Sequence, residues 1–136
     1  MAFVLDCSVT LAWLLPDERS ANLDALAERL LETSAVVPAI WPYEVSNALR
    51  MAQRRARIAE VDMAKLRRIL ASLPIEVEPV AAEHVLTVVA ELAYKLDLTT
   101  YDAAYIEVAS RRALPLATLD ERLRKASSSV GVAICP

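Results

Sequence analysis

Short and long apolar stretches alternate along the chain. The short ones are continuous apolar runs bounded by breakers, as in strands of a parallel sheet covered on both faces. They lie at residues 2–5, 35–37, 75–77, 115–118 and 132–134. The long ones repeat apolar residues at helical spacing and lie at 21–33, 42–57, 61–73, 82–96 and 101–112, with a short last helix at 121–127. Strands alternating with helices predict an α/β fold, a three-layer α/β/α sandwich with a parallel sheet of about five strands.

The composition fits one globular domain over residues 1–136. Hydrophobic residues make up 56% of the chain, which is enough for a sizeable core and leaves material for a subunit interface. No apolar run approaches the roughly 18 residues of a membrane span, and the N-terminus lacks the basic region of a signal peptide. Cys7 and Cys135 are isolated in apolar surroundings, which is typical of buried thiols. We therefore expect a cytoplasmic protein without a membrane partner.

Scarce residue types exclude several kinds of site. The only glycine is Gly131, whereas a P-loop or a dinucleotide-binding loop needs several glycines. The only histidine is His84, within a predicted helix, so neither a pair of catalytic histidines nor a histidine-based zinc site can form. We interpret His84 as a structural residue.

Four acidic residues occur where strands end and helices begin. Asp6 ends the first predicted strand, Asp120 follows the fourth, and Glu44 and Asp102 lie in the first turns of two predicted helices. Ligands of open parallel sheets bind outside the carboxyl ends of the strands. These four side chains can therefore face one pocket. Clustered carboxylates repel one another unless a cation is present, and Mg²⁺ or Mn²⁺ suits a set of oxygen ligands.

Each acid also has a plain structural interpretation. Asp6 and Asp120 are suitable N-caps or turn formers, and Glu44 favours the start of a helix. Asp102 with Thr99 has the spacing of a capping pair. The clustering of all four acids is what favours a catalytic and metal-binding site over four separate caps.

Other polar residues are candidates for supporting roles. Asn47 shares a helix face with Glu44, while Ser8 and Thr118 lie two residues from Asp6 and Asp120, and all three could orient a ligand. Local hydrogen bonding to backbone is an equal alternative for Ser8 and Thr118. The net charge is −3, to which the four acids contribute. Arg50, Arg54 and Arg57 share a helix face and are weaker candidates for RNA binding. The alternative is that they form a solvated helix face.

Ordered motifs then suggest a family. The segments VLDCSV, YEVSNALR, LTTYDAAYIEVA and LATLDERL together resemble the PIN-domain nucleases, and within them the VapC-like toxins of toxin–antitoxin pairs. The resemblance implies a parallel sheet of order 3-2-1-4-5, Mg²⁺- or Mn²⁺-dependent RNA cleavage, a homodimer and an antitoxin partner. It also implies that the family's acidic positions correspond to Asp6, Glu44, Asp102 and Asp120. Cys7 departs from the threonine common at its position.

Two alternative functions and one interface prediction remain. A phosphatase or phosphotransferase of another α/β family is disfavoured because Asp6-Cys7-Ser8 lacks the D-x-D pattern of haloacid-dehalogenase-like enzymes. A non-catalytic binding domain would have a degenerate metal site, yet all four acids are present. Residues 9–15 are so apolar that we expect them to pack, with the 21–33 helix, across a two-fold axis. A helix buried in its own core is the alternative.

Overall fold

The computed structural model describes residues 1–18 and 20–135. Strands and helices alternate in it, as the apolar pattern predicts. The strands are β1 (Phe3–Leu5), β2 (Ala35–Val37), β3 (Ile75–Val77) and β4 (Leu116–Ala117). The helices are α1 (Cys7–Leu14), α2 (Ala21–Glu32), α3 (Trp41–Arg54), α4 (Glu60–Ser72), α5 (Ala82–His84), α6 (Ala90–Leu96), α7 (Thr100–Arg112) and α8 (Glu121–Ser129). A 3₁₀ turn, η1 (Pro16–Glu18), follows α1, and a π-helical turn, η2 (Val85–Val89), joins α5 to α6.

The sheet has four parallel strands in the order β3-β2-β1-β4. The expected fifth strand at 132–134 is not formed, which corrects the predicted count. Instead, Ile134 makes an isolated parallel bridge to Leu116, through hydrogen bonds of 2.9 Å that join Leu116 to Ala133 and Cys135. Because β4 is only two residues long, it offers few backbone groups for another strand. The bridge still lies beside β4, where the order 3-2-1-4-5 places the fifth strand.

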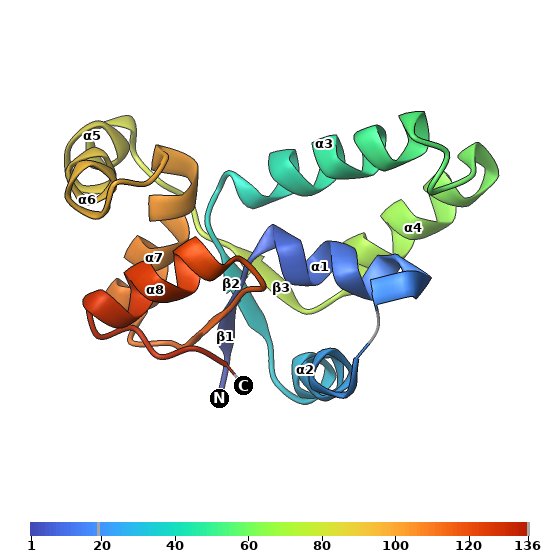
Figure 1. The fold of residues 1–136 in the computed structure, drawn as a ribbon, viewed down its shortest axis with the longest axis horizontal. Coiled ribbons are helices and arrows are strands. Elements are labelled where there is room, and N and C mark those ends of the chain that lie inside the picture. The colour runs from blue at the N-terminus through green and yellow to red at the C-terminus, as the bar shows by residue number, and fades with distance from the viewer. Residues whose placement is uncertain (19, 136) are drawn as a thin grey trace.

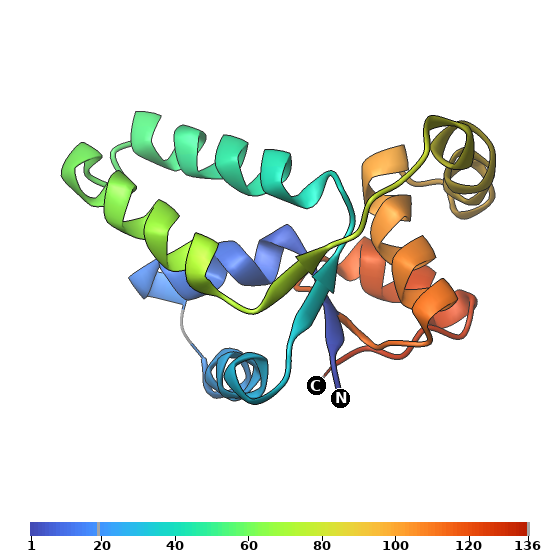
Figure 2. The same cartoon turned by 180° about the vertical axis from the view of Figure 1, so that it is seen from behind.

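Helices cover both faces of the sheet. In Figures 1 and 2, α7 and α8 lie on one side of the strands and α1 and α2 on the other. The antiparallel pair α3 and α4 extends outward on the α1 side, and α5 and α6 lie at the opposite end of the molecule. This arrangement is the expected three-layer α/β/α sandwich. Among the described residues, no helix is both long enough and apolar enough to cross a membrane.

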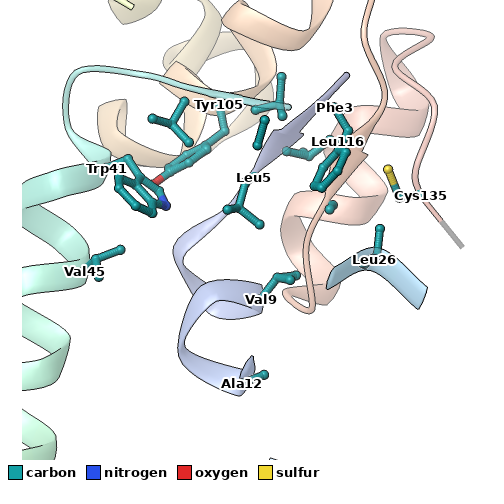
Figure 3. Packing of buried hydrophobic residues seen from close by; sticks show 14 of the residues in the cluster. Phe3, Leu5, Val9, Ala12, Leu26, Trp41, Val45, Tyr105, Leu116 and Cys135 are labelled. Atoms are coloured by element: carbon teal, nitrogen blue, oxygen red, sulfur yellow. The ribbon is translucent and has the colours of Figure 1, made fainter. Parts of the chain in front are cut away.

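The core is built around the central strands. Phe3, Val4 and Leu5 of β1 have no exposed surface, and β2 is equally buried. Figure 3 shows Leu5 between the side chains that reach it from neighbouring elements, among them Trp41 and Tyr105. The apolar run of β3 predicts a buried strand as well, but its Val77 is 43% exposed. The reason is its position at the edge of the sheet, where one side of the strand has no neighbour.

Helix α1 packs within its own fold. Val9, Ala12 and the adjoining Leu15 are at most 4% exposed. The indole Nε1 of Trp13 donates to the backbone oxygen of Leu23 at 2.8 Å, which ties α1 to α2. Leu11, Trp13 and Leu14 of the same segment are only partly buried, so the two-fold interface predicted at residues 9–15 stays a prediction.

Candidate active site

Two of the four predicted acids lie where the chain changes direction across the sheet. From β1 the chain adds β2 and β3 on one side, and then returns to add β4 on the other side of β1. Asp6 follows β1 and Asp120 closely follows β4, at the carboxyl ends of adjacent parallel strands. The gap at such a switch point is where ligands bind in open α/β sheets.

Asp6 is held in place by two hydroxyl groups. It is 7% exposed, and its Oδ2 accepts hydrogen bonds from Ser8 Oγ at 2.7 Å and Thr118 Oγ1 at 2.6 Å. Ser8 Oγ also accepts from the backbone N–H of Leu119 at 3.0 Å, and so links the ends of β1 and β4. The side chain of Asp6 does not cap α1, although Asp6 occupies the N-cap position. Ser8 and Thr118 therefore fix the orientation of this carboxylate, which is the supporting contact predicted for them.

Glu44 enters the same region from α3. It lies in the first turn of that helix, which starts at Trp41 with a proline at its second position. Its Oε1 accepts a hydrogen bond of 2.6 Å from the hydroxyl of Tyr105, a residue of α7 with no exposed surface. This bond connects the helices that carry two of the predicted acids, because Asp102 also belongs to α7.

Asp102 and Asp120 both take part in helix capping. The backbone N–H of Asp102 donates to Thr99 Oγ1 at 3.1 Å, and Thr99 is the N-cap of α7. Asp120 is the N-cap of α8, where its Oδ1 accepts from the backbone N–H groups of Arg122 and Leu123. The structural interpretation thus holds for Asp120 and for the Thr99–Asp102 pair. It does not exclude a second role, because capping engages only Oδ1 of Asp120 and only the backbone N–H of Asp102.

The acids act on one another electrostatically. Burial raises the pKa of Asp102, and the charges of Asp6 and then Asp120 raise it further, against lowering effects of Thr99 and Arg122. Burial also raises the pKa of Glu44, the Tyr105 hydrogen bond lowers it, and the charges of Asp6 and Asp102 raise it. Such mutual effects require proximity. The four side chains therefore form one negatively charged group, built from four separate parts of the chain.

The group fits a divalent cation in charge and donor type. None of the ion pairs among the described residues includes Asp6, Glu44, Asp102 or Asp120. Their carboxylate oxygens are the donors that hard cations such as Mg²⁺ and Mn²⁺ prefer. However, in the part of the chain that the structure describes, no three acidic, histidine or cysteine side chains are grouped tightly enough to hold a metal by themselves. Water or substrate oxygens must then complete any coordination shell.

The remaining predicted residues lie farther out. Asn47 makes no hydrogen bond to the four acids within the described chain, and lines a groove with Arg50 and Arg67. Arg54 is exposed near the end of α3. Arg57 forms exposed ion pairs with Asp17 and Glu18, and its role in RNA binding stays a prediction.

Tyr105 is the site residue that the sequence interpretation missed. The apolar pattern of its helix assigned it to the core, and its ring is indeed buried. A signal was available, because Tyr105 follows Asp102 by three residues and therefore shares its helix face. Cys135 is a buried thiol, as predicted, whereas Cys7 is only partly buried; burial and the charges of Asp6 and Glu44 raise the pKa of the Cys7 thiol to about 12. His84 contacts the buried Glu107 at 2.8 Å.

Comparison with known proteins identifies the family. The profile of the PIN domain family matches residues 3–128. The fold is similar to the crystal structure of PAE2754 from Pyrobaculum aerophilum, with a TM-score of 0.70 and 25% identity over 98% of this chain and 83% of that chain. It is also similar to FitAcB from Neisseria gonorrhoeae, with a TM-score of 0.65 and 18% identity over 100% and 97% of the two chains. No curated protein sequence matches.

Because the family profile covers most of the chain, the protein belongs to the PIN domain family. Members of this family are generally nucleases that use divalent metal ions. The fold and the family resemblance predicted from the sequence are thereby confirmed.

Proposed function

We propose that the chain is one nuclease domain that hydrolyses RNA internally with Mg²⁺ or Mn²⁺. The observation that carries the proposal is the group of four interacting carboxylates, Asp6, Glu44, Asp102 and Asp120, without an ion-pair partner among the described residues. A phosphatase or phosphotransferase of another family is not supported, since the chain belongs to a family of nucleases.

The chain's own residues divide the work as follows. Asp6 would be a metal ligand, because two hydroxyl donors fix its orientation at the switch point. Asp102 and Asp120 would hold the metal directly or through water. Glu44 receives a proton from the attacking water or positions that water, with its orientation set by Tyr105. The bound metal would lower the pKa of the attacking water and stabilise the charge on the leaving oxygen.

We also propose that the protein is the toxin of a toxin–antitoxin pair and acts in the cytoplasm, where its RNA substrates are found. The four-carboxylate group then offers a simple route to inhibition. An antitoxin segment that orders on binding can insert an arginine or lysine among the carboxylates, with charge-assisted hydrogen bonds in place of the metal. A complex in which the partner leaves this group open to Mn²⁺ would argue against this mode.

A homodimer remains part of the proposal, and the structure offers a second apolar face besides the one predicted at residues 9–15 and 21–33. Exposed apolar side chains surround a cavity of about 290 Å³ between α3, η2 and α7, at whose rim Val80 is 45% and Tyr101 59% exposed. Removal of such surface from water favours association. Light scattering at micromolar concentration should give a dimer mass, and a Tyr101→Asp variant should be monomeric. A monomeric wild type would reject the dimer.

The direct test of the proposed function is an RNA cleavage assay with EDTA, and with Mg²⁺ or Mn²⁺ restored. Asp102→Asn should lose cleavage while Asp97→Asn keeps it. Asp97 is a matched control because it is exposed and in the left-handed conformation, which asparagine tolerates well. Cleavage that continues in EDTA, or that survives in Asp102→Asn, would reject the proposed site.

A further inference from the structure

A polar groove is lined by residues of α3 and by one residue of α4. Its lining residues are Pro42, Tyr43, Ser46, Asn47, Arg50 and Arg67, and its volume is about 490 Å³. None of these six side chains is acidic. Tyr43, at one end of the groove, directly precedes Glu44 in α3, whose side chain lies on a different face of the helix.

Two arginines from different helices meet in this groove. Arg50 belongs to α3 and Arg67 to α4, and both are exposed. Neither takes part in an ion pair or a side-chain hydrogen bond within the described chain, in contrast to Arg57, whose guanidinium contacts Asp17 and Glu18. Two exposed guanidinium groups that line one groove, with no acidic side chain among its lining residues, make it locally positive. The groove is thus complementary in charge to a phosphate group.

We propose that this groove binds a backbone phosphate of the RNA away from the scissile bond, held by Arg50 and Arg67. The amide of Asn47 and the hydroxyl of Ser46 provide further hydrogen-bonding groups along the path. Arg50 follows Glu44 by six residues, a rise of about 9 Å and about one and two-thirds turns of the helix, so an RNA strand that reaches both side chains must pass around α3. The inference rests on the proposed nuclease function and specifies where the substrate lies. The negative net charge of the protein makes such a local site necessary for anion binding.

Binding can be measured without cleavage. We suggest fluorescence anisotropy with a labelled single-stranded RNA in EDTA, over a series of salt concentrations. The double variant Arg50→Gln/Arg67→Gln should bind RNA about tenfold more weakly, because the neutral glutamine side chains cannot form charge-assisted hydrogen bonds to phosphate. The slope of log K against log salt should become shallower by about 0.7 for each phosphate of the single strand that the variant no longer neutralises. Arg50→Lys/Arg67→Lys should keep most of the slope, because the charge is retained.

Arg55→Gln/Arg68→Gln is the matched control. It removes the same charge from the same region of α3 and α4, at exposed positions that do not line the groove. If the wild type binds RNA and both glutamine pairs bind equally well, the groove is not the phosphate site, whereas the proposed nuclease function stands. The groove would then be a candidate for an acidic segment of a partner protein. If the wild type neither binds nor cuts RNA, both proposals fail together.

Discussion

The hydrogen bond from Tyr105 to Glu44 allows a sharp test of the site, through the substitution Tyr105→Phe. The change removes one oxygen and keeps the ring, which is completely buried in the core. The bond that disappears is 2.6 Å long and has a carboxylate as acceptor. Such a bond is worth about 1.5–3 kcal/mol, but Glu44 is only half-buried and water can replace the donor, so we expect a loss of stability on the order of 1 kcal/mol.

The effect on activity should be larger than the effect on folding. Loss of a residue that orients a metal or water ligand costs about 10- to 100-fold in activity. Because the Tyr105 hydrogen bond lowers the pKa of Glu44, its removal should raise that pKa. If ionised Glu44 is required, the acid limb of the pH–rate profile should move to higher pH, in the direction set by the loss of this hydrogen bond.

The assay measures the rate at which the wild type and the Tyr105→Phe variant cleave a fluorogenic RNA at saturating Mn²⁺, from about pH 5 to about pH 8. The matched control is Tyr94→Phe, which removes the same oxygen from a residue that is 90% exposed on α6. The control should leave rate, profile and unfolding temperature unchanged. A Tyr105→Phe variant with the wild-type rate and the wild-type profile would refute the role given to Glu44.

Two further predictions concern charge. Asp6→Asn should abolish cleavage without lowering the unfolding temperature, because the amide oxygen can still accept from Ser8 and Thr118 while the repulsion on Glu44 and Asp102 is relieved; full activity would remove Asp6 from the site. Away from the site, Arg111 contacts Glu78 and Glu107. The hydrogen bond from Arg111 lowers the pKa of Glu78. Burial raises the pKa of Glu107, but the hydrogen bonds from Arg111 and His84 lower the pKa by more, so it ends below its ordinary value. The stability that these carboxylates contribute is therefore present above their ordinary pKa of 4.5 and lost as pH falls below it. Arg111→Gln should cost on the order of 1 kcal/mol at neutral pH and much less at about pH 3, as measured by thermal unfolding; an equal cost at both pH values would contradict this.

The fold was largely predictable because strands that are buried on both faces of a parallel sheet consist of continuous apolar residues. The continuous apolar runs of β1 and β2 and the helical spacing of α2 and α7 identify their elements directly. The sequence predicts the strands at the edges of the sheet less well. The run at 132–134 is as apolar as a strand, but a two-residue β4 gives it almost nothing to pair with. That limit depends on tertiary geometry, which local composition does not encode.

The candidate site was predictable in its acids and less so in their surroundings. Strand ends and helix starts locate Asp6, Glu44, Asp102 and Asp120, and Ser8 and Thr118 follow from short spacing. The pairing of Tyr105 with Glu44 joins residues 61 positions apart on different helices, so only the tertiary fold creates it. In the same way, the engagement of Arg57 by Asp17 and Glu18 depends on where η1 lies, so helix periodicity alone could not separate Arg57 from Arg50.

The central claim is that four carboxylates support hydrolysis of RNA by an external water. Chemical analysis of the RNA ends tests it most directly. If water attacks phosphorus in line with the departing 3′-oxygen, the products carry 5′-phosphate and 3′-hydroxyl ends, and EDTA stops the reaction. A 2′-deoxy substitution at the scissile nucleotide should still permit cleavage, since the 2′-hydroxyl takes no part in this step. Products with 2′,3′-cyclic phosphate ends, formed in the presence of EDTA, would contradict the account and the role of all four carboxylates.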